Sequence, residues 1–84
     1  ESGDGYIDLI IKSVRSIGII VILELKQTSD ENEDKVLTAR DAVEQILIKK
    51  YADPYIKRND IQAVISYGIC FCKKECAVAG KKLK

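Results

Sequence analysis

Two runs of apolar residues dominate the first third of the chain. The longer one extends from Ile19 to Lys26 and is aliphatic until Glu24 and Lys26 interrupt it. A run this short predicts a strand buried on both faces, because a buried helix needs more length and a 3.6-residue period. Glu24 and Lys26 are two positions apart, so they share a strand face at a separation of roughly 6 to 7 Å. They form either an ion pair at the solvent-exposed strand end or part of a site.

The second apolar run, from Tyr6 to Lys12, contains Asp8. A short polar connection separates the two runs, and strands joined in this way pair antiparallel. If the turn centres near Ser16, Asp8 falls opposite Glu24. Two carboxylates placed face to face repel each other by about 0.2 to 1 kcal/mol. A bound cation would relieve that repulsion, so this patch is a candidate metal site.

The pattern then changes from strand to helix. Residues 27–35 are polar and predict a loop, and Thr38 has the position of a helix N-cap, with Asp41 reaching back to it. The helix should end near Tyr51, because Pro54 follows shortly after. Apolar residues recur at helical spacing and predict the face that lies on the sheet. The residues that recur are Ala39, Ala42, Val43, Ile46, Leu47 and Lys50, and the buried members should be Ala42, Val43, Ile46 and Leu47.

The last third of the chain predicts two more strands. Ile61 to Cys72 is the longer, with Gly68 as a bend or bulge, and Glu75 to Ala79 forms a short edge strand. A strand, a helix and a strand in succession form a βαβ crossover, so the outer strands of that unit run parallel. The sequence therefore predicts an α/β fold: an antiparallel hairpin plus a βαβ crossover, giving a mixed sheet with a flanking helix.

The two early runs carry a family resemblance. Gly5 to Ile11, followed by Ile20 to Lys26, resembles the core motif of the PD-(D/E)XK nuclease superfamily. Residues 39–55 and 61–71 are similar to the helix and next strand of a branch often fused to AAA-type ATPase modules. The resemblance implies a restriction-endonuclease-like core over residues 1–84, as a single partial domain truncated at its N-terminus. It also implies an AAA-type ATPase module in the same longer chain as a partner.

The resemblance further implies a metal-dependent nuclease that hydrolyses DNA phosphodiester bonds. Asp8 and Glu24 would hold Mg²⁺ or Mn²⁺, with the Leu25 carbonyl as a further ligand, because these ions prefer hard oxygen donors. Lys26 would orient the attacking water or stabilise charge in the transition state. The alternative is a catalytically inactive nuclease-like fold that serves as a binding or interaction module. In many relatives an upstream helix carries a further acidic residue, and the resemblance places that helix before these residues, so the site would be incomplete.

Gln45 is a further candidate on the predicted helix. In some branches of the superfamily a glutamine, followed four residues later by tyrosine, supplements the site. This chain has Lys49 at that position, and its tyrosine comes at Tyr51. Gln45 is therefore either a surface residue or, together with Lys49 on the same helical flank, a residue that faces a phosphate.

Composition adds few constraints. The net charge is +1, so no overall field indicates a nucleic-acid binder. The acidic residues 30–34 and the C-terminal lysines are interpreted as a solvated loop and a solvated terminus. No apolar run approaches the ~20 residues that cross a bilayer, and the printed residues contain no signal-peptide pattern.

The three cysteines lie close together near the C-terminus, at Cys70, Cys72 and Cys76. Their odd number does not predict a disulfide framework, and the chain contains no histidine that could complete a zinc site. They are interpreted as small apolar residues of a buried strand. A reducing, cytoplasmic setting follows as the expectation.

Overall fold

The computed structural model describes the backbone of residues 5–12 and the complete residues 18–84. Over these residues the chain forms a four-stranded sheet with the order β1-β2-β3-β4. The strands are β1 (Gly5–Lys12), β2 (Ile19–Gln27), β3 (Ala63–Cys72) and β4 (Glu75–Lys82). β1 pairs antiparallel with β2, β2 pairs parallel with β3, and β3 pairs antiparallel with β4. The predicted mixed sheet is confirmed.

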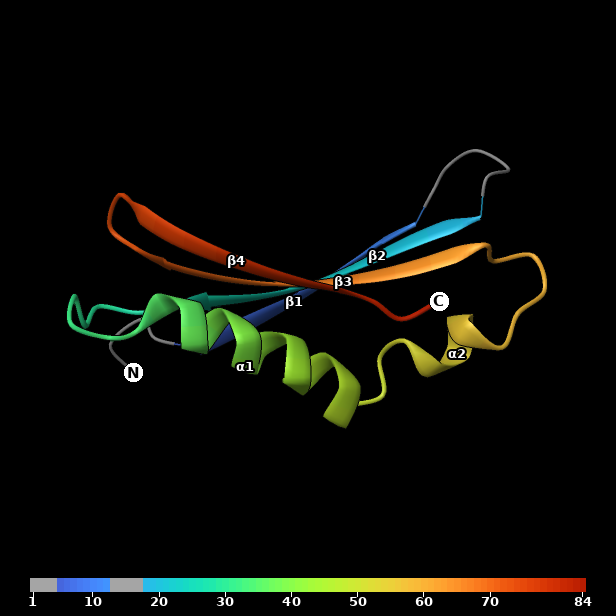
Figure 1. Ribbon diagram of the computed structural model, residues 1–84, viewed down its shortest axis with the longest axis horizontal. Helices are drawn as coiled ribbons and strands as arrows, with labels where there is room; N and C mark the ends of the chain where they lie inside the picture. The colour runs from blue at the N-terminus through green and yellow to red at the C-terminus, as the bar shows by residue number, and fades with distance from the viewer. Residues whose placement is uncertain (1–4, 13–17) are drawn as a thin grey trace.

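Two helices connect β2 to β3, namely α1 (Lys35–Ile48) and α2 (Asp53–Ile56). Both lie on the same side of the sheet, as Figure 1 shows. A parallel strand pair needs such a crossover, because a tight turn can only reverse the chain direction. The α/β fold expected from the sequence is therefore confirmed, and its helical layer covers one sheet face.

The two central strands alternate strictly between the sheet faces. From Ile19 to Leu25 on β2 and throughout β3, even-numbered positions are buried beneath the helices, while odd-numbered ones are half-buried on the opposite face. The expectation that the Ile19 strand is buried on both faces therefore holds fully for one face only. The buried apolar cluster on the helix side consists of Ile20, Ile22, Ile46, Ala52, Ile61 and Val64.

Helix α1 begins one turn earlier than the sequence predicts. Asp34 is its N-cap, and the Asp34 carboxylate accepts hydrogen bonds from the amides of Val36 and Leu37 at 3.1 and 3.2 Å. The assignment of Thr38 as the cap is wrong, because its hydroxyl donates instead to Glu33 Oε2 at 2.7 Å. Asp and Thr are both good caps, so two candidates four residues apart compete in the sequence.

The predicted buried face of α1 is confirmed for three of its four members. Ala42, Val43 and Ile46 are buried, together with Ala39, while Leu47 is half-buried. The helix ends at Ile48 rather than near Tyr51. Pro54 also begins a second helix, because it lies in the first turn of α2, where a backbone amide hydrogen is not needed.

Gly68 marks the place where helix and sheet approach most closely, rather than a bulge. The β3 register continues through Gly68 on both sides, where it pairs with Glu24 and Ala79. A Cβ atom at this position would lie 2.0 Å from the Ala39 carbonyl oxygen and 2.9 Å from the Val43 amide nitrogen. The predicted bend is therefore wrong, and glycine is needed here for contact between backbones.

The C-terminal lysines Lys81 and Lys82 are exposed, in agreement with a solvated terminus, but they lie in a strand rather than in a tail. β4 extends to Lys82, past the predicted limit at Ala79. Beyond it, the Leu83 amide donates to the Val64 carbonyl at 2.8 Å, and Lys84 Nζ donates to the Arg58 carbonyl at 2.7 Å. These bonds hold the chain end against the start of β3 and against the connection that follows α2.

Candidate active site

The backbone register of β1 and β2 places Asp8 directly opposite Glu24. This pairing confirms the register predicted from the loop position. Directly opposite positions of an antiparallel pair are the closest cross-strand neighbours. The Asp8 side chain lies outside the described residues, so a separation of about 4 to 6 Å between the two carboxylates, set by metal–oxygen bonds of 2.0 to 2.6 Å, stays a prediction.

Glu24 is the buried acid of this region. Its side chain is fully buried although it is ionisable, on the helix side of β2 between two paired strands. Its Oε1 atom lies 3.2 Å from Lys49 Nζ. The interpretation of Glu24 as part of an exposed ion pair at a strand end is therefore wrong. A buried carboxylate is tolerated when a cation and hydrogen bonds compensate its lost hydration.

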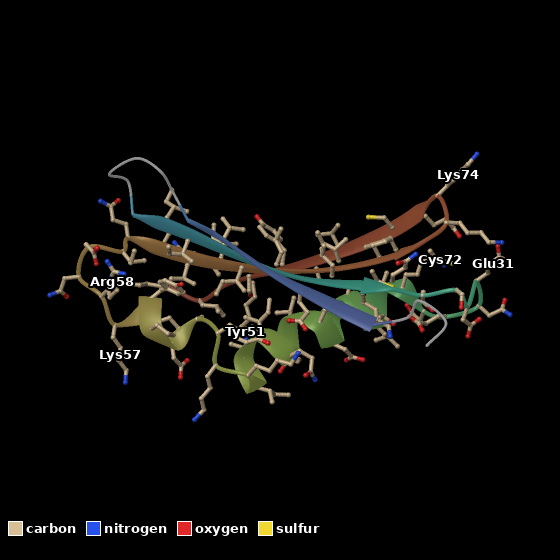
Figure 2. All side chains as sticks on the ribbon, turned by 180° about the vertical axis from the view of Figure 1, so that it is seen from behind. Glu31, Tyr51, Lys57, Arg58, Cys72 and Lys74 are labelled. Atoms are coloured by element: carbon tan, nitrogen blue, oxygen red, sulfur yellow. The ribbon has the colours of Figure 1, made fainter. Side chains whose placement is uncertain are left out.

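Lys49 reaches this carboxylate from the end of α1. It is the C-cap residue, and its own amide donates to the Gln45 carbonyl at 2.9 Å. The ammonium group also lies 5.6 Å from the centre of the Tyr51 ring, within the range of a cation–π contact. Tyr51, labelled in Figure 2, packs against the buried cluster beneath the sheet. Sequence reasoning placed Lys49 on the flank of the helix but missed its contact with Glu24.

Gln45 precedes Lys49 by one helical turn and is half-buried. Residues four apart on a helix are neighbours on one flank. Because Lys49 reaches Glu24 from this flank, the flank faces β2. Gln45 is therefore not a fully exposed surface residue, and its contact with a phosphate stays a prediction.

Lys26 and Leu25 complete the candidate residues on β2. Lys26 is half-buried and is the register partner of Cys70 on β3. Burial is the main cause that raises the pKa of the Cys70 thiol, and the charge of Glu33 adds to it, while Lys35 and Lys26 oppose the shift. The Leu25 backbone is paired on both sides, with Ile7 and Ile69.

Sequence reasoning missed the role of Glu33. The Glu33 carboxylate accepts from Thr38 Oγ1 at 2.7 Å and Thr28 Oγ1 at 3.3 Å, and Cys70 Sγ lies 3.7 Å from it. The acidic loop is therefore not simply solvated, because Glu33 ties it to the end of β2 and the start of α1. The five-residue spacing of Thr28, Glu33 and Thr38 was the available signal.

The cysteine interpretation is confirmed for two of three residues. Cys70 and Cys72 are buried in β3, whereas Cys76 is exposed on β4. Among the described side chains, no group of three or more His, Cys, Asp or Glu residues could hold a metal. A site formed by Asp8 and Glu24 is a different case, since it includes a side chain outside that set.

A shallow hollow of about 270 Å³ lies between α1 and β4, on the opposite flank of the helix from Lys49. Arg40 and Lys81 line it from the two elements, with Glu44 beside them. In the described part of the chain, no helix is both long and apolar enough to cross a membrane.

The model of one protein family, the PD-(D/E)XK nuclease superfamily, matches residues 1–81. The chain belongs to this superfamily. Comparisons with curated proteins and with solved structures give no match. Membership in the PD-(D/E)XK superfamily indicates a nuclease-type function, and its nucleases generally use divalent metals. The order of an acidic strand, a Glu-x-Lys strand and a crossover helix in this chain agrees with the match.

Proposed function

We propose that this chain is a divalent-metal-dependent nuclease domain that hydrolyses DNA phosphodiester bonds. The observation that carries the proposal is the direct pairing of Asp8 with Glu24 in a chain of the PD-(D/E)XK superfamily. The pairing is the backbone arrangement that two carboxylates need in order to share one ion.

The residues present fit a hard divalent cation. Glu24 offers a buried carboxylate, Asp8 is its cross-strand neighbour, and a positively charged group already lies at 3.2 Å from Glu24 Oε1. The buried carboxylate creates a negative electrostatic potential at the position where the ammonium group lies, and this potential attracts other cations as well. Mg²⁺ and Mn²⁺ prefer carboxylate and carbonyl oxygens, and these are the donors that β1 and β2 offer.

Each residue has a defined part in this proposal. Asp8, Glu24 and the Leu25 carbonyl would hold the ion, which supplies an activated water and stabilises charge on the phosphate. Lys26 lies on the same strand face as Glu24, where its ammonium group orients the water or the phosphate. Gln45 binds a phosphate oxygen from the facing flank of α1. Arg40 and Lys81 offer a second, sequence-independent contact to the DNA backbone.

The test compares two near-isosteric variants with one control. Asp8→Asn and Glu24→Gln each remove a charged ligand oxygen, so cleavage of plasmid and single-stranded DNA in Mg²⁺ should fall by at least about 100-fold. Asp41→Asn, which changes an exposed carboxylate of α1 outside the site and outside the hollow, should leave cleavage unchanged. Mn²⁺ binding, followed by calorimetry, should be weakened in the first two variants only.

The alternative, a nuclease-like binding module, predicts a different set of results. Wild-type protein would then show neither cleavage nor a metal-dependent rise in melting temperature, and DNA binding would not depend on Mg²⁺. Stability of the metal-free variants does not separate the two cases. Glu24 pairs with Lys49, so removing its charge disturbs the fold whether or not a metal binds.

A further inference from the structure

We propose that Lys49 is a built-in cation, which neutralises Glu24 in the metal-free protein and is displaced from it when the metal binds. This inference rests on the proposed metal site. Lys49 then acts through Glu24 alone: by competing for this carboxylate, it sets the metal concentration at which the site is filled.

The distances make the two cations competitors. Lys49 Nζ lies 3.2 Å from Glu24 Oε1, and Mg²⁺ would bind a carboxylate oxygen at 2.0 to 2.1 Å. An ammonium group and a divalent ion on one buried carboxylate would therefore lie close together in a medium of low dielectric constant. Their repulsion is large there, and it favours occupation by one cation at a time.

Lys49 is the group that can move. Glu24 is fixed in a strand with a partner on each side, and its side chain is fully buried. The Lys49 side chain is 36% exposed and follows the last residue of α1. Its flexible four-carbon stem can carry the ammonium group into solvent without a backbone change. The ammonium group already lies 5.6 Å from the centre of the Tyr51 ring, and a movement away from Glu24 can keep this cation–π contact.

The metal-free fold needs such a cation. Glu24 is buried, and Asp8 is its direct cross-strand neighbour, so the strand pair carries two acidic positions at its centre. A buried carboxylate without a compensating charge is strongly destabilising. Lys49 supplies the compensation until metal arrives, and the metal must then compete with it, which lowers the apparent metal affinity.

The first test measures Mn²⁺ affinity and melting temperature for Lys49→Met, with Lys50→Met as the matched control. Lys50 is the next residue, is exposed, and carries the same charge. Removing the competitor should raise the affinity by about tenfold, within the usual range of coupling between two binding events. The metal-free Lys49→Met protein should melt at a lower temperature than wild type, and saturating Mn²⁺ should abolish most of that difference. Lys50→Met should match wild type in both measurements.

The second test uses wild-type protein, so it does not depend on whether the variant folds. Amine acetylation followed by mass spectrometry should modify Lys49 slowly without metal and several times faster at saturating Mg²⁺. The reactivity of Lys50 serves as the internal reference, since it should not respond to the metal.

The outcomes separate this inference from the proposed function. If wild type and Lys49→Met bind Mn²⁺ equally, and Lys49 acetylation does not respond to Mg²⁺, the metal site stands and the role of Lys49 is refuted. If no variant binds Mn²⁺, the proposed metal site itself is refuted. Weaker binding in Lys49→Met would also overturn the inference, because it would make Lys49 a support of the metal rather than its competitor.

Discussion

Replacing Gly68 with alanine tests how closely α1 must approach the sheet. The added Cβ atom would lie 2.0 Å from the Ala39 carbonyl oxygen, far below the 3.4 Å at which ordinary contact begins. It would also lie 2.8 Å from Ala42 Cβ and 2.9 Å from the Val43 amide nitrogen. Two of these three atoms belong to the helix backbone, so no side-chain rotation relieves the clash, and α1 must lift away from β3.

The expected loss of stability is large for a single methyl group. Overpacking typically costs about 1 to 3 kcal/mol, and a clash with backbone atoms belongs at the top of that range. A glycine-to-alanine change without strain would instead stabilise by about 0.4 to 1 kcal/mol, so the sign of the result is informative. A loss of about 3 kcal/mol lowers the melting temperature by roughly 12 to 24 °C for a domain of this size.

Gly80→Ala provides the matched control, since it adds the same methyl group to the neighbouring strand. Its Cβ would press on the Tyr67 ring, at 2.9 to 3.0 Å, and a ring can turn aside, while the Ser66 carbonyl oxygen at 3.7 Å is at ordinary contact distance. Urea and thermal unfolding, followed by circular dichroism, should show a large loss for Gly68→Ala and a change within about 1 kcal/mol for Gly80→Ala. Equal stability of the two variants would refute the close approach. Because Gly68 is the register partner of Glu24, lifting α1 should also weaken the contact with Lys49.

Two further predictions follow from burial. Ile46→Ala should lower the free energy of unfolding by about 2 to 5 kcal/mol in urea denaturation, because Ile46 is fully buried in the cluster. Ile48→Ala, at an exposed position, should lower it by under about 0.5 kcal/mol. Similar losses in the two variants would contradict the assignment of the buried face. A maleimide should label Cys76 quickly in the native protein but label Cys70 and Cys72 only on unfolding. Cys70 and Cys72 are buried, and the raised pKa of the Cys70 thiol further slows its reaction. Rapid labelling of all three thiols, counted by mass spectrometry, would contradict the buried packing.

The strands and their register were predictable because they depend on local features. Alternating or continuous apolar runs mark β2 and β3, and a short connection leaves little freedom for the pairing that sets Asp8 opposite Glu24. The helix face was predictable for the same reason, since Ile46 and its neighbours repeat at 3.6 residues. Errors arose where two local solutions competed, as with Asp34 and Thr38 at the start of α1.

The features that stayed hidden depend on contacts between distant elements. Gly68 suggested a bulge within its own strand, whereas the reason for a glycine is its contact with helix residues 39, 42 and 43, which lie 25 to 29 positions away in the sequence. Lys49 lies 25 residues from Glu24, so spacing could place it on a flank but could not show which carboxylate it would reach. Glu33 appeared to be one of several loop acids until folding brought Thr38 and Cys70 to it.

The alternation of buried and half-buried positions from Ile19 to Leu25 on β2 has a consequence for folding fidelity. Glu24 has the same parity as Ile20 and Ile22, so the carboxylate and the apolar cluster are assigned to the helix side by one choice of register. A slip by a single residue would transfer all three to the opposite face together. A misregistered chain would thus lose its packing and its acidic centre in the same event. Errors in strand pairing should therefore remove molecules from the folded population, rather than leave folded molecules without the carboxylate in place.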